Sequence, residues 1–177
     1  MARVALIEER DHPELAAEIA KIRAGRGTLL NLYKLLLHSP ALAMTWFDHV
    51  GAARWKTLLD GATRELVIIR IAYLNKVDYV LAQHVPKLAL PEGLTREQCD
   101  ALADWHGSRL FNAQQRAVLA YTDAMTREAG VTDALHAELA RHFDERRIVE
   151  LAILIGTYNM HTRVLQALAI DPEPPAQ

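Results

Sequence analysis

Apolar residues recur at the three-to-four-residue spacing of an amphipathic helix between residues 40 and 59, and they become nearly continuous between residues 63 and 84. The second stretch reads TRELVIIRIAYLNKVDYVLAQH. Its β-branched run at residues 67–69 is compatible with a strand, but the stretch continues to Leu74 and the chain offers no second strand to pair with it. We expect a helix that is apolar on nearly every side, and such a helix lies at the centre of a fold.

Start and stop signals divide the chain into a series of helices. Residues that begin or cap a helix are expected at Pro13, Pro40, Thr63, Thr95, Asn112, Thr132 and Asp144. The predicted helices cover residues 13–24, 28–38, 40–59, 63–74, 78–85, 95–105, 112–130, 132–143 and 145–170. A break at Asn75 and Lys76 makes two of them a hairpin, and Pro86 is expected to kink or end the second because it lacks a backbone donor.

Length and composition favour one all-α domain. The 177 residues are 51% hydrophobic, which is enough to bury a substantial core, and Gly and Pro are scarce. We therefore predict a single helical domain over residues 1–177, with its core at about residues 13–170. The polar, proline-rich residues 171–177 are expected to be a disordered tail.

Charge and cysteine content narrow the class of protein. A net charge of -2 gives no indication of a nucleic-acid partner or of an anionic membrane surface. No segment is long and apolar enough for a transmembrane helix, and the first residues lack the apolar core of a signal peptide. The one cysteine, Cys99, excludes an internal disulfide framework and is compatible with a reducing compartment. A soluble, cytoplasmic protein without membrane or nucleic-acid partners is expected.

An acid–base pair lies within the apolar stretch. In one straight helix Glu65 and His84 would be about 28 Å apart, at about 1.5 Å per residue. A hairpin at Asn75 instead brings His84 back toward Glu65. A glutamate that accepts a hydrogen bond from imidazole fixes the tautomer of the ring and raises its basicity, which suits proton transfer. Tyr73 and Tyr79 are candidate donors to a developing oxyanion.

A purely structural role for these charges stays open at this point. Glu65 has Arg64 and Arg70 as possible ion-pair partners, and His84 has the alternative of being an ordinary core histidine. No helical His-x-x-x-His or Glu-x-x-His pair falls in residues 63–84, so no metal site is predicted there.

A faint internal repeat relates the apolar stretch to the last helix. Four residue types recur at one constant offset: Glu65, Leu66, Ile68 and Tyr73 match Glu150, Leu151, Ile153 and Tyr158. Chance is one explanation for so few identities. A duplicated helical unit is the other, and it would pack the two helices together and place Tyr158, Asn159 and His161 near the first.

The segment RELVIIRIAYLNKVDYVLAQHV closely resembles the core of the carboxymuconolactone decarboxylase and alkyl hydroperoxidase D family. The flanking segments RAGRGTLLNLYKLLLHSP and FDERRIVELAILIGTYNMHTRVL resemble it as well, so the likeness covers roughly residues 15–168. The resemblance implies an all-helical bundle that acts without a cofactor. It also implies a homo-oligomer, commonly a trimer or a hexamer, and the apolar residues 66–74 and 149–156 favour burial between subunits.

The peroxidase branch of this family has a glutamate, then Cys-x-x-Cys, then a histidine four residues after the second cysteine. By resemblance the glutamate is Glu65 and the histidine is His84, but valines, Val77 and Val80, stand at both cysteine positions. Thiol peroxidase chemistry needs a thiolate nucleophile and a resolving thiol, so peroxidase activity is not expected. The resemblance implies the cysteine-free, lactone decarboxylase side of the family.

The resulting hypothesis is a decarboxylase-like lyase that acts on a small carboxylated lactone or a similar acid. His84 would shuttle the proton, Glu65 would orient the ring, and Tyr73 or Tyr79 would stabilise an enolate. The predicted substrate-binding residues are Arg70, with Arg64 as the other candidate cation, together with Tyr158 and His161. The alternative is a non-catalytic oligomeric binding or scaffold protein with the same fold.

Overall fold

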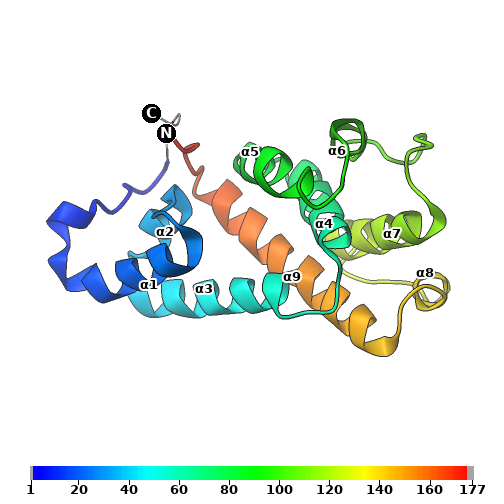
Figure 1. Cartoon of the computed structure of the whole chain (residues 1–177), viewed down its shortest axis with the longest axis horizontal. Coiled ribbons are helices and arrows are strands. Elements are labelled where there is room, and N and C mark those ends of the chain that lie inside the picture. Colours follow the sequence, from blue (N-terminus) through cyan, green and yellow to red (C-terminus); the bar gives the residue numbers. More distant parts are fainter. Residues whose placement is uncertain (1, 175–177) are drawn as a thin grey trace.

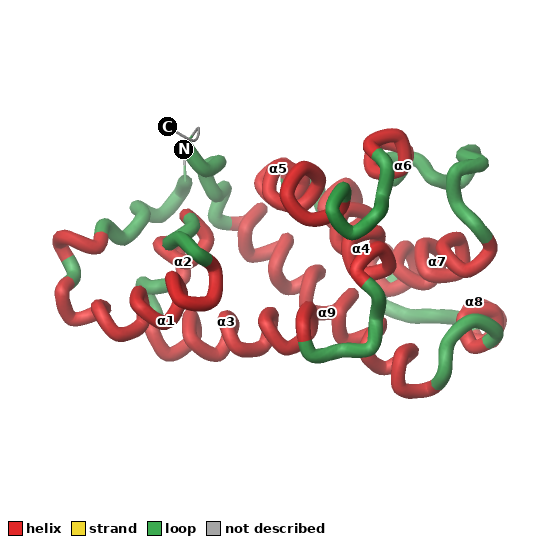
Figure 2. The backbone as a smooth tube through the Cα atoms, viewed as in Figure 1, coloured by secondary structure: helices red, strands yellow, loops and turns green. Residues whose placement is uncertain are grey.

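A computed structural model describes residues 2–174, and within that range the chain is built of helices joined by loops (Figures 1 and 2). The α-helices are α1 (Ala16–Arg26), α2 (Asn31–Leu36), α3 (Pro40–Trp55), α4 (Gly61–Leu74), α5 (Asp78–His84), α6 (Arg96–Ala101), α7 (Ala113–Arg127), α8 (Asp133–Ala140) and α9 (Glu145–Ala167). Short 3-10 helices cover Glu9–Asp11 and Pro13–Leu15, and a π-helix covers Val85–Ala89. The predicted all-α fold is confirmed, and no described helix combines the length and hydropathy needed to span a bilayer.

Helix α4 lies at the centre of the fold, as its apolar sequence predicts. Every residue from Thr63 to Ala72 is buried, including Arg64, Glu65 and Arg70. The helix packs against α5, α7 and α9. A helix enclosed in this way must pair each of its charged side chains, because an unpaired buried charge is costly.

Two groups of helices flank this centre. In Figure 1, α1, α2 and α3 lie at one end of an elongated molecule and α6, α7 and α8 at the other, while α9 runs diagonally between them. Helix α9 packs against α3, α4, α7 and α8. The expected packing of the two apolar helices, α4 against α9, is therefore present.

The turn between α4 and α5 produces the predicted hairpin. Lys76 adopts a left-handed φ of 55°. The Val77 N–H donates to the Ala72 carbonyl at 2.9 Å, and the Lys76 N–H donates to the Tyr73 carbonyl at 3.2 Å. This pair of bonds is the Schellman arrangement, which satisfies the last carbonyls of α4 and reverses the chain.

Several helices begin or end a few residues away from their predicted positions. Asp60, not Thr63, caps α4: its carboxylate accepts from the Thr63 backbone N–H at 2.8 Å and from the Thr63 hydroxyl at 2.7 Å. Helix α1 continues to Arg26 and ends at Gly27, whose φ of 78° suits glycine. The α-helix α5 ends at His84, just before Pro86, and the chain continues directly into the π-helix, in which Pro86 has no N–H to donate.

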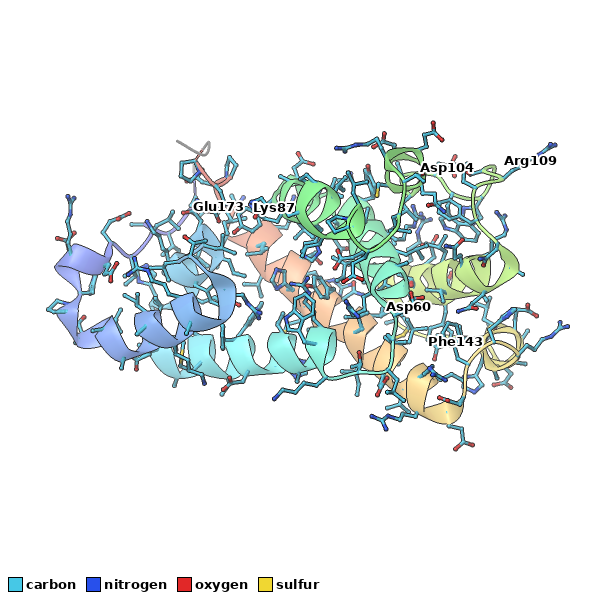
Figure 3. The ribbon with its side chains drawn as sticks, in the orientation of Figure 1. Asp60, Lys87, Asp104, Arg109, Phe143 and Glu173 are labelled. Carbon is cyan, nitrogen blue, oxygen red and sulfur yellow. The ribbon has the colours of Figure 1, made fainter. Side chains whose placement is uncertain are left out.

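The described residues of the C-terminal tail lie beside α2 and α5, where Figure 3 labels Glu173. The Glu173 carboxylate accepts from the Asn31 backbone N–H at 2.8 Å and from the Tyr79 hydroxyl at 2.5 Å. The Asn31 side chain also donates to the Pro172 carbonyl at 2.9 Å. These bonds connect residues 171–174 to α2 and α5. The disorder expected for residues 171–177 stays a prediction. Residues 175–177 lie outside the described part of the chain.

Candidate acid–base site

Glu65 is the residue on which three helices converge. Its carboxylate is 1% exposed. Oε2 accepts a hydrogen bond from Nδ1 of His84 on α5 at 2.6 Å, and Oε1 accepts one from Nη2 of Arg54 on α3 at 3.3 Å. The approach of Glu65 and His84 that the hairpin predicts is thus confirmed. The ion-pair partner of Glu65 is Arg54 and neither Arg64 nor Arg70.

The arrangement sets the protonation of His84. An ionised carboxylate can only accept hydrogen bonds, so Nδ1 of His84 carries the proton that Glu65 accepts. Burial lowers the pKa of His84; the bonded Glu65 acts in the opposite direction, and the positive charge of Arg54 lowers the pKa further. The ring is therefore neutral at pH 7. Nε2 is then the nitrogen left to exchange a proton with a bound molecule.

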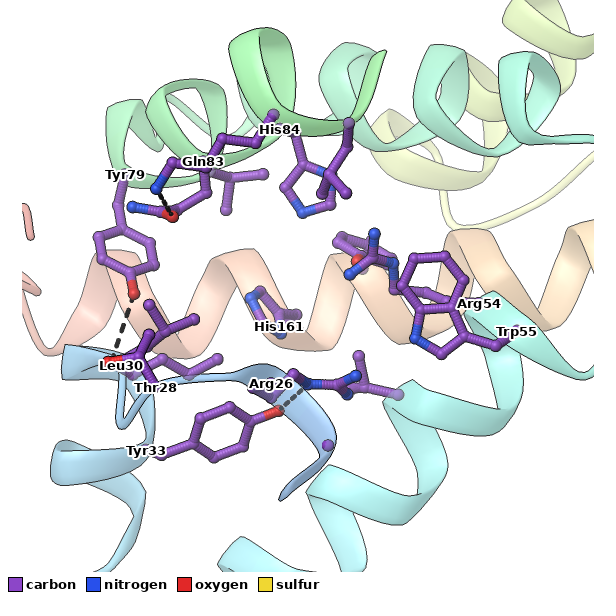
Figure 4. A pocket seen from close by; sticks show the side chains of 17 residues that line it. Arg26, Thr28, Leu30, Tyr33, Arg54, Trp55, Tyr79, Gln83, His84 and His161 are labelled. Carbon is purple, nitrogen blue, oxygen red and sulfur yellow. Dashed lines mark hydrogen bonds between the residues drawn. The ribbon is translucent and has the colours of Figure 1, made fainter. Parts of the chain in front are cut away.

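A cavity of about 430 Å³ adjoins this pair. Figure 4 shows His84 reaching into it from above, with His161 across from it and Arg54 and Arg26 at one side. Its volume lies in the range of small-molecule sites. The charged or polar lining residues are Arg26, Thr28, Tyr33, Arg54, Trp55, Tyr79, Gln83, His84, Lys87, Tyr158 and His161. None of the described residues that line it is acidic.

Helix α9, which packs against α4, contributes Tyr158 and His161 to the cavity wall. The Tyr158 ring packs between the two imidazoles, with centroid distances of 5.7 Å to His84 and 5.3 Å to His161. Burial lowers the pKa of His161 to about 3, and electrostatic interactions with His84, Arg54 and Arg26 add to the effect. His161 is therefore a neutral polar group at pH 7. Asn159 is directed elsewhere, since its amide donates to the Thr126 hydroxyl at 3.0 Å.

The two candidate tyrosines of the hairpin lie in different places. Tyr79 lines the cavity, and burial together with the hydrogen bond to Glu173 raises the pKa of its hydroxyl. Tyr73 is half-buried and is not among the described residues that line the cavity. Its distance from the Glu65–His84 pair follows from its position near the far end of α4. The structure therefore brings Tyr79 to the cavity and leaves Tyr73 outside it.

The predicted cations do not reach the cavity. Arg70 makes a two-pronged ion pair with Asp123 on α7, with both N–O distances at 2.6 Å, and also donates to the Leu102 carbonyl at 2.7 Å. Arg64 donates to the Leu59 carbonyl at 2.9 Å and to the Glu92 carboxylate at 3.2 Å. Both arginines hold the fold together, and the substrate-binding role predicted for Arg70 has no geometric basis.

Arg26 and Arg54 are the cavity arginines that sequence reasoning missed. Arg54 follows Val50 by four residues, on the buried face of α3, so an arginine on an apolar stripe was the available signal. Arg26 is the last residue of α1 and comes from the glycine-rich segment RAGRG. Arg26 is half-buried at the cavity wall.

The positions of the absent cysteines are fully enclosed. Val77 and Val80 are 3% and 1% exposed, and Val80 forms part of the cavity wall. Cys99 is completely buried on α6, and burial raises the pKa of its thiol. Within residues 2–174 no group of three or more His, Cys, Asp or Glu side chains is arranged to hold a metal ion.

Comparison with known proteins gives one family and one fold. The model of the carboxymuconolactone decarboxylase family matches residues 40–124. The uncharacterized protein YnjA of Escherichia coli (strain K12) is 35% identical over 121 residues. The match covers 68% of this chain and 66% of YnjA, so it spans just under two thirds of the length of that relative.

Two solved structures share the fold over nearly the whole chain. The alkylhydroperoxidase AhpD core, an uncharacterized peroxidase-related protein from Ralstonia eutropha JMP134, superposes with a TM-score of 0.82 at 18% identity, covering 97% of this chain and 92% of its own. The debrominase Bmp8 C82A, in complex with 2,3,4-tribromopyrrole, superposes with a TM-score of 0.78 at 20% identity, covering 96% and 91%. At these identities the similarity establishes a common helical architecture.

Proposed function

The chain belongs to the carboxymuconolactone decarboxylase family, and we propose on this premise that it is a cofactor-independent acid–base enzyme acting on a small carboxylated lactone or a related β-keto or β,γ-unsaturated acid. The observation that carries the proposal is the buried Glu65–His84 hydrogen bond of 2.6 Å at the wall of a cavity of about 430 Å³. A histidine oriented by a carboxylate beside a small-molecule cavity is the arrangement that proton transfer requires.

The roles follow from the geometry. When a carboxylated lactone loses CO2, the electron pair of the broken carbon–carbon bond stays on the ring as an enolate. Nε2 of the neutral His84 first takes up a proton from solvent, and the resulting imidazolium delivers it to the enolate. Each turnover thus consumes one solvent proton, releases one CO2 and returns the ring to its neutral form. Glu65 holds the imidazole in one orientation and stabilises its charged form. Because burial lowers the pKa of His84, its protonated form is a strong acid.

Thiol-dependent peroxidase activity is not part of the proposal. Val77 and Val80 occupy the positions of the redox cysteines, and Cys99 is enclosed on a different helix. A sulfenic acid at Cys99 would have no second thiol in the chain to resolve it. The peroxidase-related names of the structural neighbours therefore apply to those proteins and are not extended to this chain.

The experiment is a turnover assay with a carboxylated lactone in D2O. NMR follows loss of the substrate, release of CO2 and the appearance of deuterium at the carbon that lost its carboxylate. Stoichiometric CO2 with one deuterium in the product is the expected result. A parallel assay with an alkyl hydroperoxide and a dithiol reductant should show no consumption. Peroxide turnover that is lost in the Cys99→Ser variant, or a panel of carboxylated lactones and β-keto acids left unchanged, would contradict the proposal and, in the second case, favour a non-catalytic binding protein.

A further inference from the structure

The cavity wall holds buried guanidinium groups whose hydrogen bonds are incomplete. Nη2 of Arg26 and Nε of Arg54 are shielded from solvent and have no partner among the described residues. Nδ1 of His161, which lines the same cavity (Figure 4), also has none. A buried donor without an acceptor costs about 1–3 kcal/mol, and more when it is charged, so each such group needs an explanation.

The charged side chains that line the cavity carry one sign of charge. Arg26, Arg54 and Lys87 line it, while no acidic residue does among those described. Glu65 lies behind the wall and is already shared between Arg54 and His84, and Glu173 accepts a hydrogen bond from the Tyr79 hydroxyl. Lys87 donates to Gln83 at 2.8 Å near the exposed rim. The inner part of the cavity thus has an excess of positive charge that Glu65 does not balance.

Aromatic contacts hold both guanidinium groups in place. The Arg54 guanidinium stacks on the Trp55 ring at 4.1 Å, and the Arg26 guanidinium stacks on the Phe47 ring at 4.8 Å. Nε of Arg26 also donates to the Tyr33 hydroxyl at 3.1 Å. Planar guanidinium groups that are fixed in this way match the two oxygens of a carboxylate better than a flexible ammonium does.

We propose that Arg26 and Arg54 form the carboxylate-binding subsite of this cavity, so that an organic acid binds with its carboxylate at the two arginines and its ring toward His84. The proposal names the substrate-recognition residues of the site under Proposed function and rests on that function for the identity of the natural ligand. It requires no turnover, because the subsite binds any small planar acid of suitable size. The electrostatic influence of both arginines on His161 agrees with their closeness to the cavity.

The test uses two ligands that differ only in charge. The probes are 2-furoate, a five-membered ring with a carboxylate, and 2-furamide, its neutral counterpart, and isothermal titration calorimetry measures the dissociation constant of each. Wild-type protein should bind 2-furoate at least about tenfold more tightly than 2-furamide, the effect expected of a charge-assisted hydrogen bond. Arg26→Gln should remove this preference, and Arg26→Lys should restore part of it.

Arg26 is the informative position because it makes no contact with the Glu65–His84 pair, unlike Arg54. The matched control is Arg23→Gln, which removes the same charge three residues earlier on α1, where Arg23 is exposed and paired with Glu9. This control should leave the preference for 2-furoate unchanged. Thermal melts establish that each variant is folded at the titration temperature.

The outcomes separate the subsite from the reaction. Equal binding of both ligands by the wild-type protein, no binding of 2-furoate at all, or an equal weakening of both ligands by Arg26→Gln would overturn the subsite. Intact, Arg26-dependent binding of 2-furoate in a protein that turns over no carboxylated lactone would support the subsite and overturn the reaction. Turnover of a carboxylated lactone with a KM that Arg26→Gln leaves unchanged would support the reaction and overturn the subsite.

Discussion

Glu65 and His84 are 19 positions apart in the chain, yet Oε2 and Nδ1 lie 2.6 Å from each other. The hairpin makes this possible, because α5 runs back along α4 after the reversal at Lys76 and places the end of α5 beside the start of α4. Arg54, from a third helix, holds the second oxygen of the carboxylate at 3.3 Å. The pair is therefore fixed from both sides before any ligand enters.

Replacement of His84 should show whether the Glu65–His84 pair serves catalysis or only stabilises the fold. We expect His84→Gln to stay folded and to lose roughly two to four orders of magnitude in turnover of the carboxylated lactone, the usual contribution of a general acid–base group. Turnover per folded molecule and thermal melts measure the two effects, with His136→Gln on the exposed face of α8 as the control. A His84→Gln protein that melts early but retains full activity per folded molecule would show that the pair is only structural.

Arg70 should matter for stability and not for binding. Its ion pair with Asp123 is nearly dry, with Arg70 1% exposed. Removal of one partner leaves an uncompensated buried charge, so Asp123→Ala should lower the free energy of unfolding by about 3–5 kcal/mol. Urea denaturation measures this, and the double change Arg70→Met with Asp123→Leu should recover much of the loss. A loss of ligand affinity in Arg70→Met without a loss of stability would instead restore its predicted binding role.

Stability should fall as the solution becomes acidic. Burial holds the pKa of His161 at about 3 and lowers the pKa of His84, whereas the unfolded histidines titrate near 6.5. Below pH 6.5 the unfolded state thus binds more protons than the folded state, so the stabilisation is complete above pH 6.5 and is lost as the pH falls from there toward 3.

We expect the urea midpoint to decrease between pH 7 and pH 5. His161→Phe should flatten that dependence by up to about 1.4 kcal/mol per pH unit, the free energy that one proton contributes. Replacement of the exposed His136 by Gln is the control and should leave the slope unchanged. An identical slope in wild type and His161→Phe would mean that His161 takes up its proton as readily in the folded protein as in the unfolded chain.

At the chain reversal after α4, Lys76 is not the residue type that gives the highest stability. Lys76 adopts a φ of 55°, a region that costs residues with a Cβ roughly 1–2 kcal/mol. Lys76→Gly should therefore raise the free energy of unfolding by about 0.5–1 kcal/mol after the entropy of glycine is deducted. Lys76→Ala removes the same charge and keeps the Cβ, so it should bring no such gain. Equal stability of the two variants in urea denaturation would argue against strain at this turn.

The outer face of α9 predicts self-association. Val149, Ile153 and Met160 are 56%, 48% and 39% exposed on one side of the helix. Residues 66–72, which contributed to the same expectation, are buried within the chain, so the prediction now rests on α9. Multi-angle light scattering at micromolar concentration should give the mass of an oligomer, and Ile153→Asp should shift it toward the monomer. Wild-type protein that elutes only as a monomer would contradict the prediction.

Local signals in the sequence predicted the parts of the fold that depend on neighbouring residues. The capping boxes Thr95–Gln98 and Asn112–Gln115 are both present, and Thr132 and Asp144 cap their helices. Each of these contacts spans three residues, so residue type alone is informative. The cap of α4 is Asp60 and not the predicted Thr63. Both are residue types that cap helices, they stand three residues apart, and they hydrogen-bond to each other.

Local patterns in the sequence were sufficient to predict the helical class, the central position of α4, the family and the approach of His84 to Glu65, because each depends on a periodicity, a motif or a single hairpin. Tertiary structure alone decided which cations face the cavity. Arg54, Arg64 and Arg70 have the same chemistry and lie close together in the chain, but their partners come from distant segments: Asp123 is 53 positions from Arg70, and Glu92 is 28 from Arg64. A long side chain is directed by whichever carboxylate or carbonyl the packing of helices places within its reach, and no spacing along the sequence encodes that choice.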